Sequence, residues 1–192
     1  RMLSYRHAFH AGNFADVHKH LGLMLCLESL CKKEKPFSVI DTHAGAGLYT
    51  LDDERALLTG ETNDGIIRLL SYCKERNPPS ALNRYISLIL PYIQSNSYPG
   101  SPEIERSFLR DNDYLTLIEL HSTEINILRA AMEGGGKDPR IHIHFRNAYE
   151  ACSALCPPSP RRGLLIMDPS YEVDSDYKNT VHSLEVVHKK WA

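Results

Sequence analysis

The chain has 192 residues, of which 42% are hydrophobic and 24% charged, and its formal net charge is −2 at pH 7. This ordinary globular composition excludes a disordered or collagen-like chain, and the balanced charge excludes a histone-like, globally basic binder of nucleic acid. No apolar run reaches the roughly 18 residues of a membrane-spanning helix, and the start lacks the apolar core of a signal peptide. We therefore expect no membrane partner. Because the five cysteines are an odd number in a chain too long to need disulfides, we expect reduced thiols and a cytoplasmic protein.

Four short apolar runs predict buried β-strands, and each run leads into a polar residue. The runs cover residues 37–41, 114–119, 141–145 and 163–167, and the polar residues are Asp41, Glu119, Asn147 and Asp168. Segments with a helical spacing of apolar residues lie before and between them, at 18–35, about 101–109, 121–132, 148–156 and 177–191. This alternation predicts an α/β fold with a mostly parallel sheet and helices on both faces. Ligands bind beyond the carboxyl ends of such strands, so we expect the four polar residues to converge there.

Residues 51–96 interrupt this alternation. Apolar residues near 66–70 and 82–92 have the spacing of amphipathic helices, and Arg-Asn-Pro-Pro-Ser at 76–80 predicts a turn between them. A second turn is predicted at 98–102, where the sequence is Tyr-Pro-Gly-Ser-Pro. The chain has no internal repeat and is interpreted as one domain.

A loop of small residues, Asp41-Thr42-His43-Ala44-Gly45-Ala46-Gly47, follows the first strand directly. Glycine and alanine lack bulk, so the backbone of such a loop can approach a ligand closely. The loop is not a P-loop, because no Gly-Lys-Ser/Thr follows, and it lacks the full dinucleotide-binding fingerprint. Two interpretations stay open: a tight strand-to-helix turn, or a cradle for an amino-acid-bearing nucleoside such as S-adenosylmethionine.

Two other strand-end residues have both a functional and a structural interpretation. Glu119 is suited to accept hydrogen bonds from two ribose hydroxyls, or it is an exposed acid at the end of a strand. Asn147 is suited to read an adenine edge through its paired donor and acceptor, or it caps the following helix. The sequence leaves both pairs of alternatives open.

The tetrapeptide Asp168-Pro169-Ser170-Tyr171 follows the last predicted strand. The exocyclic amine of a nucleic-acid base is a poor nucleophile, because its lone pair is delocalised into the ring. The Asp168 carboxylate and the Pro169 carbonyl are suited to accept the two amine hydrogens, and Tyr171 is suited to stack on a base flipped into the site. The alternative is an Asp-Pro turn followed by a core tyrosine.

The N-terminal residues carry four of the ten histidines, His7, His10, His18 and His20. Together with Asp41 and His43 they make a metal-dependent hydrolase an alternative function. However, the two histidine pairs lack the i,i+4 spacing of a helical zinc pair, and no Cys-x-x-Cys is present. We therefore expect no metal site.

Blocks of residues along the chain resemble a known family. Ser4-Tyr5-Arg6-His7-Ala8-Phe9-His10-Ala11-Gly12-Asn13, with Ala15-Asp16-Val17 and Lys19-His20, is similar to the opening signature of the bacterial methyltransferases that modify an adenine N6 in large-subunit (23S) ribosomal RNA, the RlmJ type. The loop at 41–47, residues 98–102, Glu119-Leu120-His121 and Arg161-Arg162-Gly163 match that family in the same order. The resemblance implies a Rossmann-like class I S-adenosylmethionine-dependent methyltransferase core, with a small helical insertion at about 54–97.

The resemblance also implies roles for individual residues. Contacts with S-adenosylmethionine are assigned to His20, His43, Ser101, Glu119, Asn147, Ala148 and Asp168. The catalytic residues are Asp168, Pro169 and Tyr171, and the substrate-binding residues are Tyr5, Lys19 and Tyr171. The implied reaction is metal-free methyl transfer to N6 of an adenine flipped out of large-subunit ribosomal RNA.

Two departures from the family pattern stand out. Ser170 stands in place of the second proline of Asp-Pro-Pro-Tyr, and Asn147-Ala148 stands in place of Asp-Gly. These departures make a non-catalytic RNA-binding relative a further alternative. A methyltransferase of this architecture has more strands than the four predicted here, so we expect C-terminal strands to be missing and residues 1–192 to be part of a longer, monomeric protein.

Overall fold

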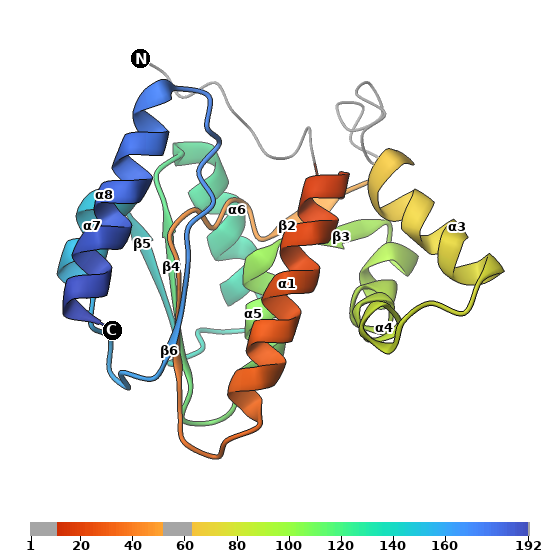
Figure 1. The fold of residues 1–192 in the computed structure, drawn as a ribbon, viewed down its shortest axis with the longest axis horizontal. Coiled ribbons are helices and arrows are strands. Elements are labelled where there is room, and N and C mark those ends of the chain that lie inside the picture. Colours follow the sequence, from red (N-terminus) through yellow and green to blue (C-terminus); the bar gives the residue numbers. More distant parts are fainter. Residues whose placement is uncertain (1–10, 52–62, 192) are drawn as a thin grey trace.

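The computed structural model describes residues 11–51 and 63–191, and its centre is a four-stranded sheet (Figure 1). The strands run in the order β5-β4-β1-β6 and comprise β1 (Ser38–Asp41), β4 (Tyr114–Glu119), β5 (Ile141–Phe145) and β6 (Gly163–Ile166). All three neighbouring pairs are parallel. The four predicted strands and the parallel α/β sheet are confirmed, and the bounds differ by at most one residue.

Five helices pack on the sheet: α1 (Phe14–Cys31), α5 (Ser101–Phe108), α6 (Ser122–Glu133), α7 (Ala148–Leu155) and α8 (Asp174–Lys190). Side chains along a strand alternate between its two faces. Val39, Leu115 and Leu117 accordingly share one core with α1, α5 and α6. Ile40 and Ile118 share another core with α7 and α8. The sheet is therefore covered by helices on both faces, as predicted (Figure 1).

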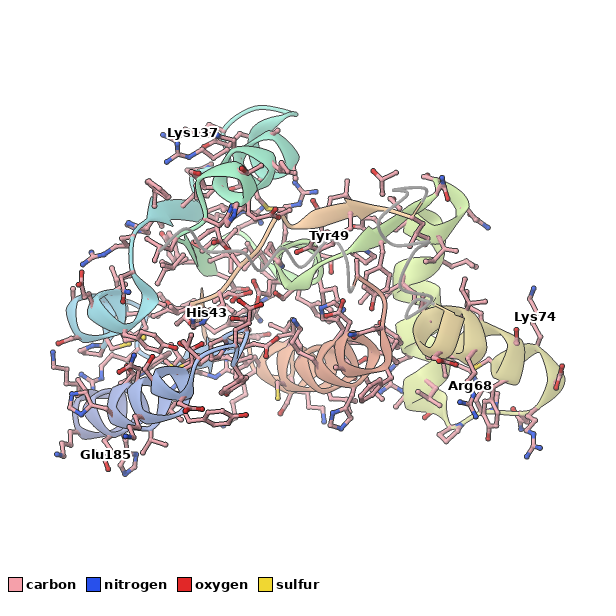
Figure 2. All side chains as sticks on the ribbon, turned by 90° about the horizontal axis from the view of Figure 1, so that it is seen from above. His43, Tyr49, Arg68, Lys74, Lys137 and Glu185 are labelled. Carbon is pink, nitrogen blue, oxygen red and sulfur yellow. The ribbon has the colours of Figure 1, made fainter. Side chains whose placement is uncertain are left out.

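A second apolar region lies beyond α1. Its elements are η2 (Asn63–Ile67), α3 (Arg68–Glu75), α4 (Ser80–Gln94) and two antiparallel strands, β2 (Leu48–Thr50) and β3 (Ser97–Pro99). Viewed from above, α3 with Arg68 and Lys74 lies at the opposite end of the molecule from α7 and α8 (Figure 2). We call η2, α3 and α4 the helical segment. It contains the helices predicted within residues 51–96, and its description as an insertion stays a prediction.

Two local predictions are wrong. Residues 98–102 are not simply a turn, because Tyr98 and Pro99 belong to β3 and pair with β2. Strands of three residues carry no periodic signal, and these two are far apart in the sequence. Helix α1 begins at Phe14 instead of residue 18, because the side chain of Asn13 accepts a hydrogen bond from the backbone N–H of Asp16 and caps the helix there.

Strand β1 lies where the order of the sheet reverses. The chain passes outward from β1 through β4 to β5, and then returns to the other side of β1 to form β6. In open α/β sheets, ligands bind in the crevice beyond the carboxyl ends at such a point. The backbone N–H of Thr42 donates to the carbonyl of Ile166 at 3.0 Å, which brings the loop after β1 beside the segment that begins at Asp168.

Two expectations drawn from the amino-acid composition concern membrane-spanning helices and the state of the cysteines. Within residues 11–51 and 63–191, no helix is both long enough and apolar enough to cross a membrane. All five cysteines lie in these ranges and are free thiols, as expected, and Cys152 and Cys156 are buried.

Candidate functional site

A cavity of about 770 Å³ lies at the carboxyl ends of the strands. Its wall contains all seven residues predicted to contact the cofactor, namely His20, His43, Ser101, Glu119, Asn147, Ala148 and Asp168. Lys19, Pro169 and Tyr171 also line it. The structure thus brings the predicted site residues together around one space, with the exception of Tyr5, which lies outside the described residues.

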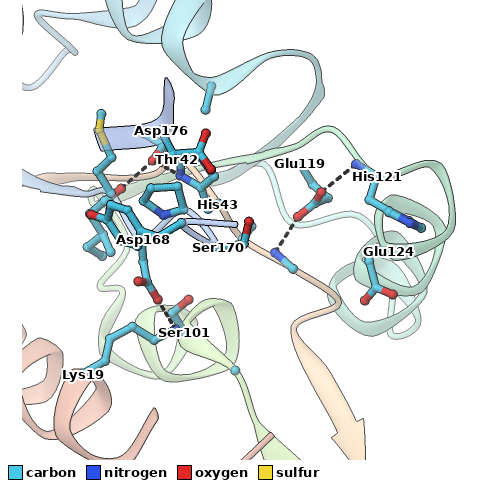
Figure 3. Close-up of a pocket in the computed structure, with 18 of the residues that line it drawn as sticks. Lys19, Thr42, His43, Ser101, Glu119, His121, Glu124, Asp168, Ser170 and Asp176 are labelled. Atoms are coloured by element: carbon cyan, nitrogen blue, oxygen red, sulfur yellow. Dashed lines mark hydrogen bonds and ion pairs between the residues drawn. The ribbon is translucent and has the colours of Figure 1, made fainter. Parts of the chain in front are cut away.

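The loop after β1 is tied to the end of β4 by Glu119. The backbone N–H of Gly45 donates to Glu119 Oε2 at 2.8 Å, and the N–H groups of Leu120 and His121 donate to Oε1 at 2.8 and 2.7 Å (Figure 3). A Cβ at Gly45, whose φ is +64°, would lie 2.4 Å from the Tyr49 hydroxyl oxygen, so the turn requires glycine. Burial raises the pKa of Glu119, and the three N–H groups oppose that shift. Glu119 therefore anchors the loop, and its Oε2 keeps a lone pair for a ligand hydroxyl.

Beneath the loop, Asp41 holds two parts of the cavity wall together. Its Oδ2 accepts a hydrogen bond from the Ser101 hydroxyl at 2.6 Å, and its Oδ1 accepts one from the backbone N–H of His43 at 3.1 Å. Glu105, one turn after Ser101 on α5, is fully buried, and its carboxyl oxygens have no hydrogen-bond partner among the described residues. Burial and the nearby Asp41 carboxylate raise the pKa of Glu105 well above its usual value, which favours the neutral carboxyl group.

Thr42 sets the tautomer of His43. The Thr42 hydroxyl donates to the carbonyl of Ile166 at 2.9 Å, and its oxygen lies 2.8 Å from His43 Nδ1. Because a hydroxyl has one hydrogen, it accepts from His43, so the imidazole carries its hydrogen on Nδ1 and Nε2 is an acceptor. Burial lowers the pKa of His43 to about 4, although the Asp168 and Asp176 carboxylates oppose the shift. His43 therefore lines the cavity as a neutral acceptor.

Lys19 joins α1 to the segment after β6. Its Nζ donates to Asp168 Oδ2 at 2.7 Å (Figure 3). The same Nζ lies 3.4 Å from Asp16 Oδ1. Burial disfavours the charged ammonium, but the Asp16 and Asp168 carboxylates outweigh it and raise the pKa of Lys19. The Asp168 side chain remains 43% exposed, so its carboxylate is accessible to a ligand. The structure thus places Lys19, a predicted substrate contact, directly against the predicted catalytic carboxylate.

Asn147 caps helix α7. Its Oδ1 accepts hydrogen bonds from the backbone N–H groups of Tyr149 and Glu150, at 2.9 and 3.2 Å. The helix-cap interpretation is confirmed, and the group that Asn147 offers to a ligand is its Nδ2 donor. Ala148 is buried beside it, at the start of α7. The cofactor contacts of both residues stay predictions.

The segment after β6 leaves the sheet as an irregular loop. Pro169 is buried, whereas Tyr171 has a φ of +55° and is 38% exposed. The centroids of the Tyr171 and Tyr177 rings are 4.7 Å apart. Tyr171 is therefore not a core tyrosine, which rules out the structural alternative for this residue. Its stacking on a flipped base stays a prediction.

Carboxylates dominate the charge of the cavity wall. The acidic residues that line it are Asp16, Glu119, Glu124, Asp168, Glu172 and Asp176, and the lysine and arginine side chains are Lys19 and Arg146. A concave surface of this sign attracts cations. Within residues 11–51 and 63–191, no group of three or more His, Cys, Asp or Glu side chains is arranged to hold a metal ion.

Several residues that position the site were missed by the sequence analysis. Asp16 accepts a hydrogen bond from the backbone N–H of Gly12 at 3.0 Å and pairs with Lys19. Tyr98 contacts His20 from β3, and Glu105 lies beneath Ser101. The available signals were the position of Asp16 inside the N-terminal block and the four-residue spacing of Glu105 from Ser101.

Comparison with known proteins identifies relatives along the whole chain. A family model described as "Ribosomal RNA large subunit methyltransferase D, RlmJ" matches residues 34–192. Ribosomal RNA large subunit methyltransferase J of Escherichia coli K12 is 42% identical over 194 residues, which cover 100% of this chain and 67% of that protein. The protein of the same name from Haemophilus influenzae is 40% identical over 195 residues, with the same coverage of 100% and 67%.

A solved structure agrees with these sequence relatives. The crystal structure of protein LPL1258 from Legionella pneumophila matches with a TM-score of 0.80 and 36% identity, over 95% of this chain and 66% of that one. The chain thus spans about two thirds of the length of the relatives it matches. With a family match over most of its residues and relatives aligned from end to end, the chain belongs to the RlmJ family of large-subunit ribosomal RNA methyltransferases.

Proposed function

We propose that this chain binds S-adenosylmethionine in the cavity at the carboxyl ends of the strands and transfers its methyl group to N6 of an adenine in large-subunit ribosomal RNA. One observation carries the proposal. The ends of β1, β4 and β6 bring the glycine-containing loop, Glu119 and Asp168 to the same cavity, in a chain that belongs to a family of ribosomal RNA methyltransferases. The N6 atom and the flipped state of the adenine come from the family resemblance.

The cavity fits this cofactor in charge and in shape. S-adenosylmethionine is a sulfonium cation, and the wall has more carboxylates than lysine and arginine side chains. Gly45 lines the cavity with its backbone and carries no side chain, so a ligand can approach the main chain there. When bound, the cofactor supplies an activated methyl group.

The chain offers complementary hydrogen-bonding groups for the polar parts of the cofactor. Glu119 Oε2 is suited to accept from a ribose hydroxyl, and His43 Nε2 is a second acceptor. Asn147 Nδ2 is suited to donate to a base nitrogen. The first turn of α5, at Ser101, presents backbone N–H groups and the positive end of a helix dipole to the carboxylate of the amino-acid group.

Asp168 and Pro169 prepare the attacking amine. The Asp168 carboxylate and the Pro169 carbonyl accept the two hydrogens of the adenine amine, which directs its lone pair toward the methyl donor. Lys19 holds Asp168 Oδ2 in a fixed position, and Tyr171 at the cavity mouth provides the face on which the base stacks. Once the nitrogen is alkylated its proton becomes acidic and is lost to water, so no strong base is needed.

No observation favours the metal-dependent hydrolase. Asp41 and His43 are already hydrogen-bonded to Ser101 and Thr42, and His7 and His10 lie outside the described residues.

A ribosomal RNA substrate implies a cytoplasmic location. We keep the expectation of one methyltransferase domain that acts as a monomer and contains an insertion at about 54–97.

The proposal is tested by incubating the protein with unmodified large-subunit ribosomal RNA and cofactor labelled in the methyl group. We expect label in N6-methyladenine after digestion of the RNA to nucleosides. The matched control is Asp111→Asn, because Asp111 is an exposed acid at the opposite end of the sheet, and this variant should retain full activity. Binding of RNA without any methyl transfer would instead identify the chain as a non-catalytic relative.

A further inference from the structure

A buried row of hydroxyls connects the helical segment to the cavity. Tyr85 on α4 and Tyr98 on β3 are both 0% exposed, and His20 on α1 is 1% exposed. The hydroxyl oxygens of Tyr85 and Tyr98 are 2.9 Å apart, and the Tyr98 oxygen is 3.0 Å from His20 Nδ1. The His20 and Tyr98 rings also stack, with centroids 5.6 Å apart. Three elements therefore meet in one continuous hydrogen-bonded row that ends at a residue of the cavity wall.

The number of available hydrogens decides which group donates and which accepts in each hydrogen bond of this row. Tyr85 has no other hydrogen-bond partner for its hydroxyl in the part of the chain that the structure describes, so its hydrogen is used only if Tyr85 donates to Tyr98. Tyr98 then donates its own hydrogen to His20 Nδ1. The reverse direction would leave the Tyr85 hydrogen buried without an acceptor, which destabilises the folded chain. Burial raises the pKa of both tyrosines, so both hydroxyls keep their hydrogens at neutral pH.

We propose that Tyr85 and Tyr98 are positioning residues that hold His20 as the neutral tautomer with its hydrogen on Nε2, so that His20 donates a hydrogen bond to an acceptor oxygen of the methyl donor. The inference rests on the proposed function for the identity of that ligand. The tautomer itself follows from the row of hydroxyls alone.

The two cavity histidines then have opposite roles. His43 carries its hydrogen on Nδ1 because the Thr42 hydroxyl is committed to Ile166, and it presents an acceptor. His20 accepts at Nδ1 and presents a donor. A ligand with both donors and acceptors, such as an amino acid joined to a nucleoside, suits such a pair better than a ligand with only one kind of group. The helical segment, through Tyr85, thereby contributes to the cofactor site without lining it.

Nitrogen NMR of histidine reads the tautomer directly. The protein is labelled with ¹⁵N on histidine, and the His20 signal is identified by its loss in His20→Gln. In the wild type we expect an unprotonated Nδ1 and a protonated Nε2 for His20. Tyr98→Phe removes the donor to Nδ1 but keeps the ring, so the signal should shift toward a mixture of tautomers, and S-adenosylmethionine should bind about fivefold more weakly by calorimetry.

The hydroxyls of Tyr85 and Tyr92 provide variants to compare with Tyr98→Phe. Tyr85→Phe should have a smaller effect than Tyr98→Phe, because the Tyr98 hydroxyl can still donate to His20. Tyr92→Phe is the matched control, because Tyr92 lies on α4 like Tyr85 but its hydroxyl donates to Glu103 on α5, outside the row. We expect this variant to leave the His20 signal and the cofactor affinity unchanged. Thermal melts confirm that each variant is folded.

Two results would overturn the inference: a protonated His20 Nδ1 in the wild type, or a folded Tyr98→Phe variant with unchanged tautomer and unchanged affinity. A wild-type protein that shows the expected tautomer but does not bind S-adenosylmethionine contradicts the proposed function and the identity of the ligand, and leaves the tautomer assignment standing.

Discussion

The two ends of the parallel sheet are built in opposite ways. At the amino ends of the strands, arginine side chains donate hydrogen bonds that connect neighbouring loops. Arg110 donates to Asp113 and to the carbonyls of Lys33 and Lys35. Arg162 donates to the carbonyls of Leu30 and Lys35. At the carboxyl ends, carboxylates bond to backbone N–H groups and hydroxyls around a cavity, as Glu119 does with Gly45 and Asp41 with Ser101.

This difference separates stability from function. The cations at the amino end fill the space between loops and satisfy carbonyl groups there. The acids at the carboxyl end shape a space and give it a negative wall. We therefore expect substitutions at the amino end to lower the free energy of unfolding, and substitutions at the carboxyl end to lower methyl transfer with smaller effects on folding.

The largest effect is expected for Asp168→Asn. The amide keeps the size of the side chain but loses an acceptor for the adenine amine, so kcat should fall by about 10²- to 10³-fold. Because Asp168 is 43% exposed, the melting temperature should change little. Single-turnover methyl transfer and a thermal melt measure the two quantities. Activity equal to that of the wild type would contradict the assigned role.

The opposite pattern is expected for Asp113→Ala at the amino end. Asp113 is 1% exposed and accepts hydrogen bonds from the backbone N–H groups of Phe37 and Arg110. Removal of the carboxylate should lower the free energy of unfolding by about 2–3 kcal/mol, measured by urea denaturation. Methyl transfer per folded molecule should remain unchanged. A large loss of kcat in the folded variant would show that the two ends are not independent.

The lowered pKa of His43 predicts that the stability of the folded chain depends on pH. Its pKa is lowered from 6.5 to about 4 in the folded chain, so between these values the unfolded chain binds the extra proton. Stability due to this group is complete above pH 6.5 and decreases as the pH falls toward 4, by up to about 1.4 kcal/mol per pH unit. His43→Gln should flatten this part of the stability curve, whereas the exposed His188→Gln should not. Parallel curves for wild type and His43→Gln would contradict the assignment.

Glu105→Gln should change the stability of the chain least at low pH, where the wild-type carboxyl group is protonated in both the folded and the unfolded chain. The pKa of Glu105 is raised above 4.5 by burial, so the unfolded chain loses this proton first and wild-type stability decreases as the pH rises above 4.5. The variant should match the wild type within about 0.5 kcal/mol at pH 4.5 and be the more stable of the two at pH 8. Denaturation at the two pH values decides this. A variant that is less stable than the wild type at pH 8 would show that Glu105 is ionised.

The sheet could be predicted from the sequence because its signals are local. Each strand is a short apolar run that leads into a polar residue, so the positions of Asp41, Glu119, Asn147 and Asp168 at one edge follow from the parallel order. The pairing of β2 with β3 could not be predicted in the same way. It joins two three-residue segments separated by the whole helical segment, and one of them contains Pro99.

The chemistry inside the cavity was harder to predict than its location. The pairing of Lys19 with Asp168 and the row from Tyr85 to His20 join residues that are distant in sequence and have no shared pattern. The helix cap formed by Asn147 became evident only from the geometry at the start of α7, and its contact with an adenine edge stays a prediction. Sequence patterns identify which residues reach a site, and tertiary contacts decide which of their atoms are engaged.

Calorimetric titration of S-adenosylmethionine into the protein shows whether the cavity at the carboxyl ends binds this cofactor. We expect one site per chain, and we expect its loss in Gly45→Val because a side chain there collides with Tyr49. Gly135→Val, at a position with open space around it, should bind like the wild type. A folded wild-type protein that does not bind the cofactor, or a folded Gly45→Val variant that binds it normally, would contradict the assignment of this cavity as the cofactor site.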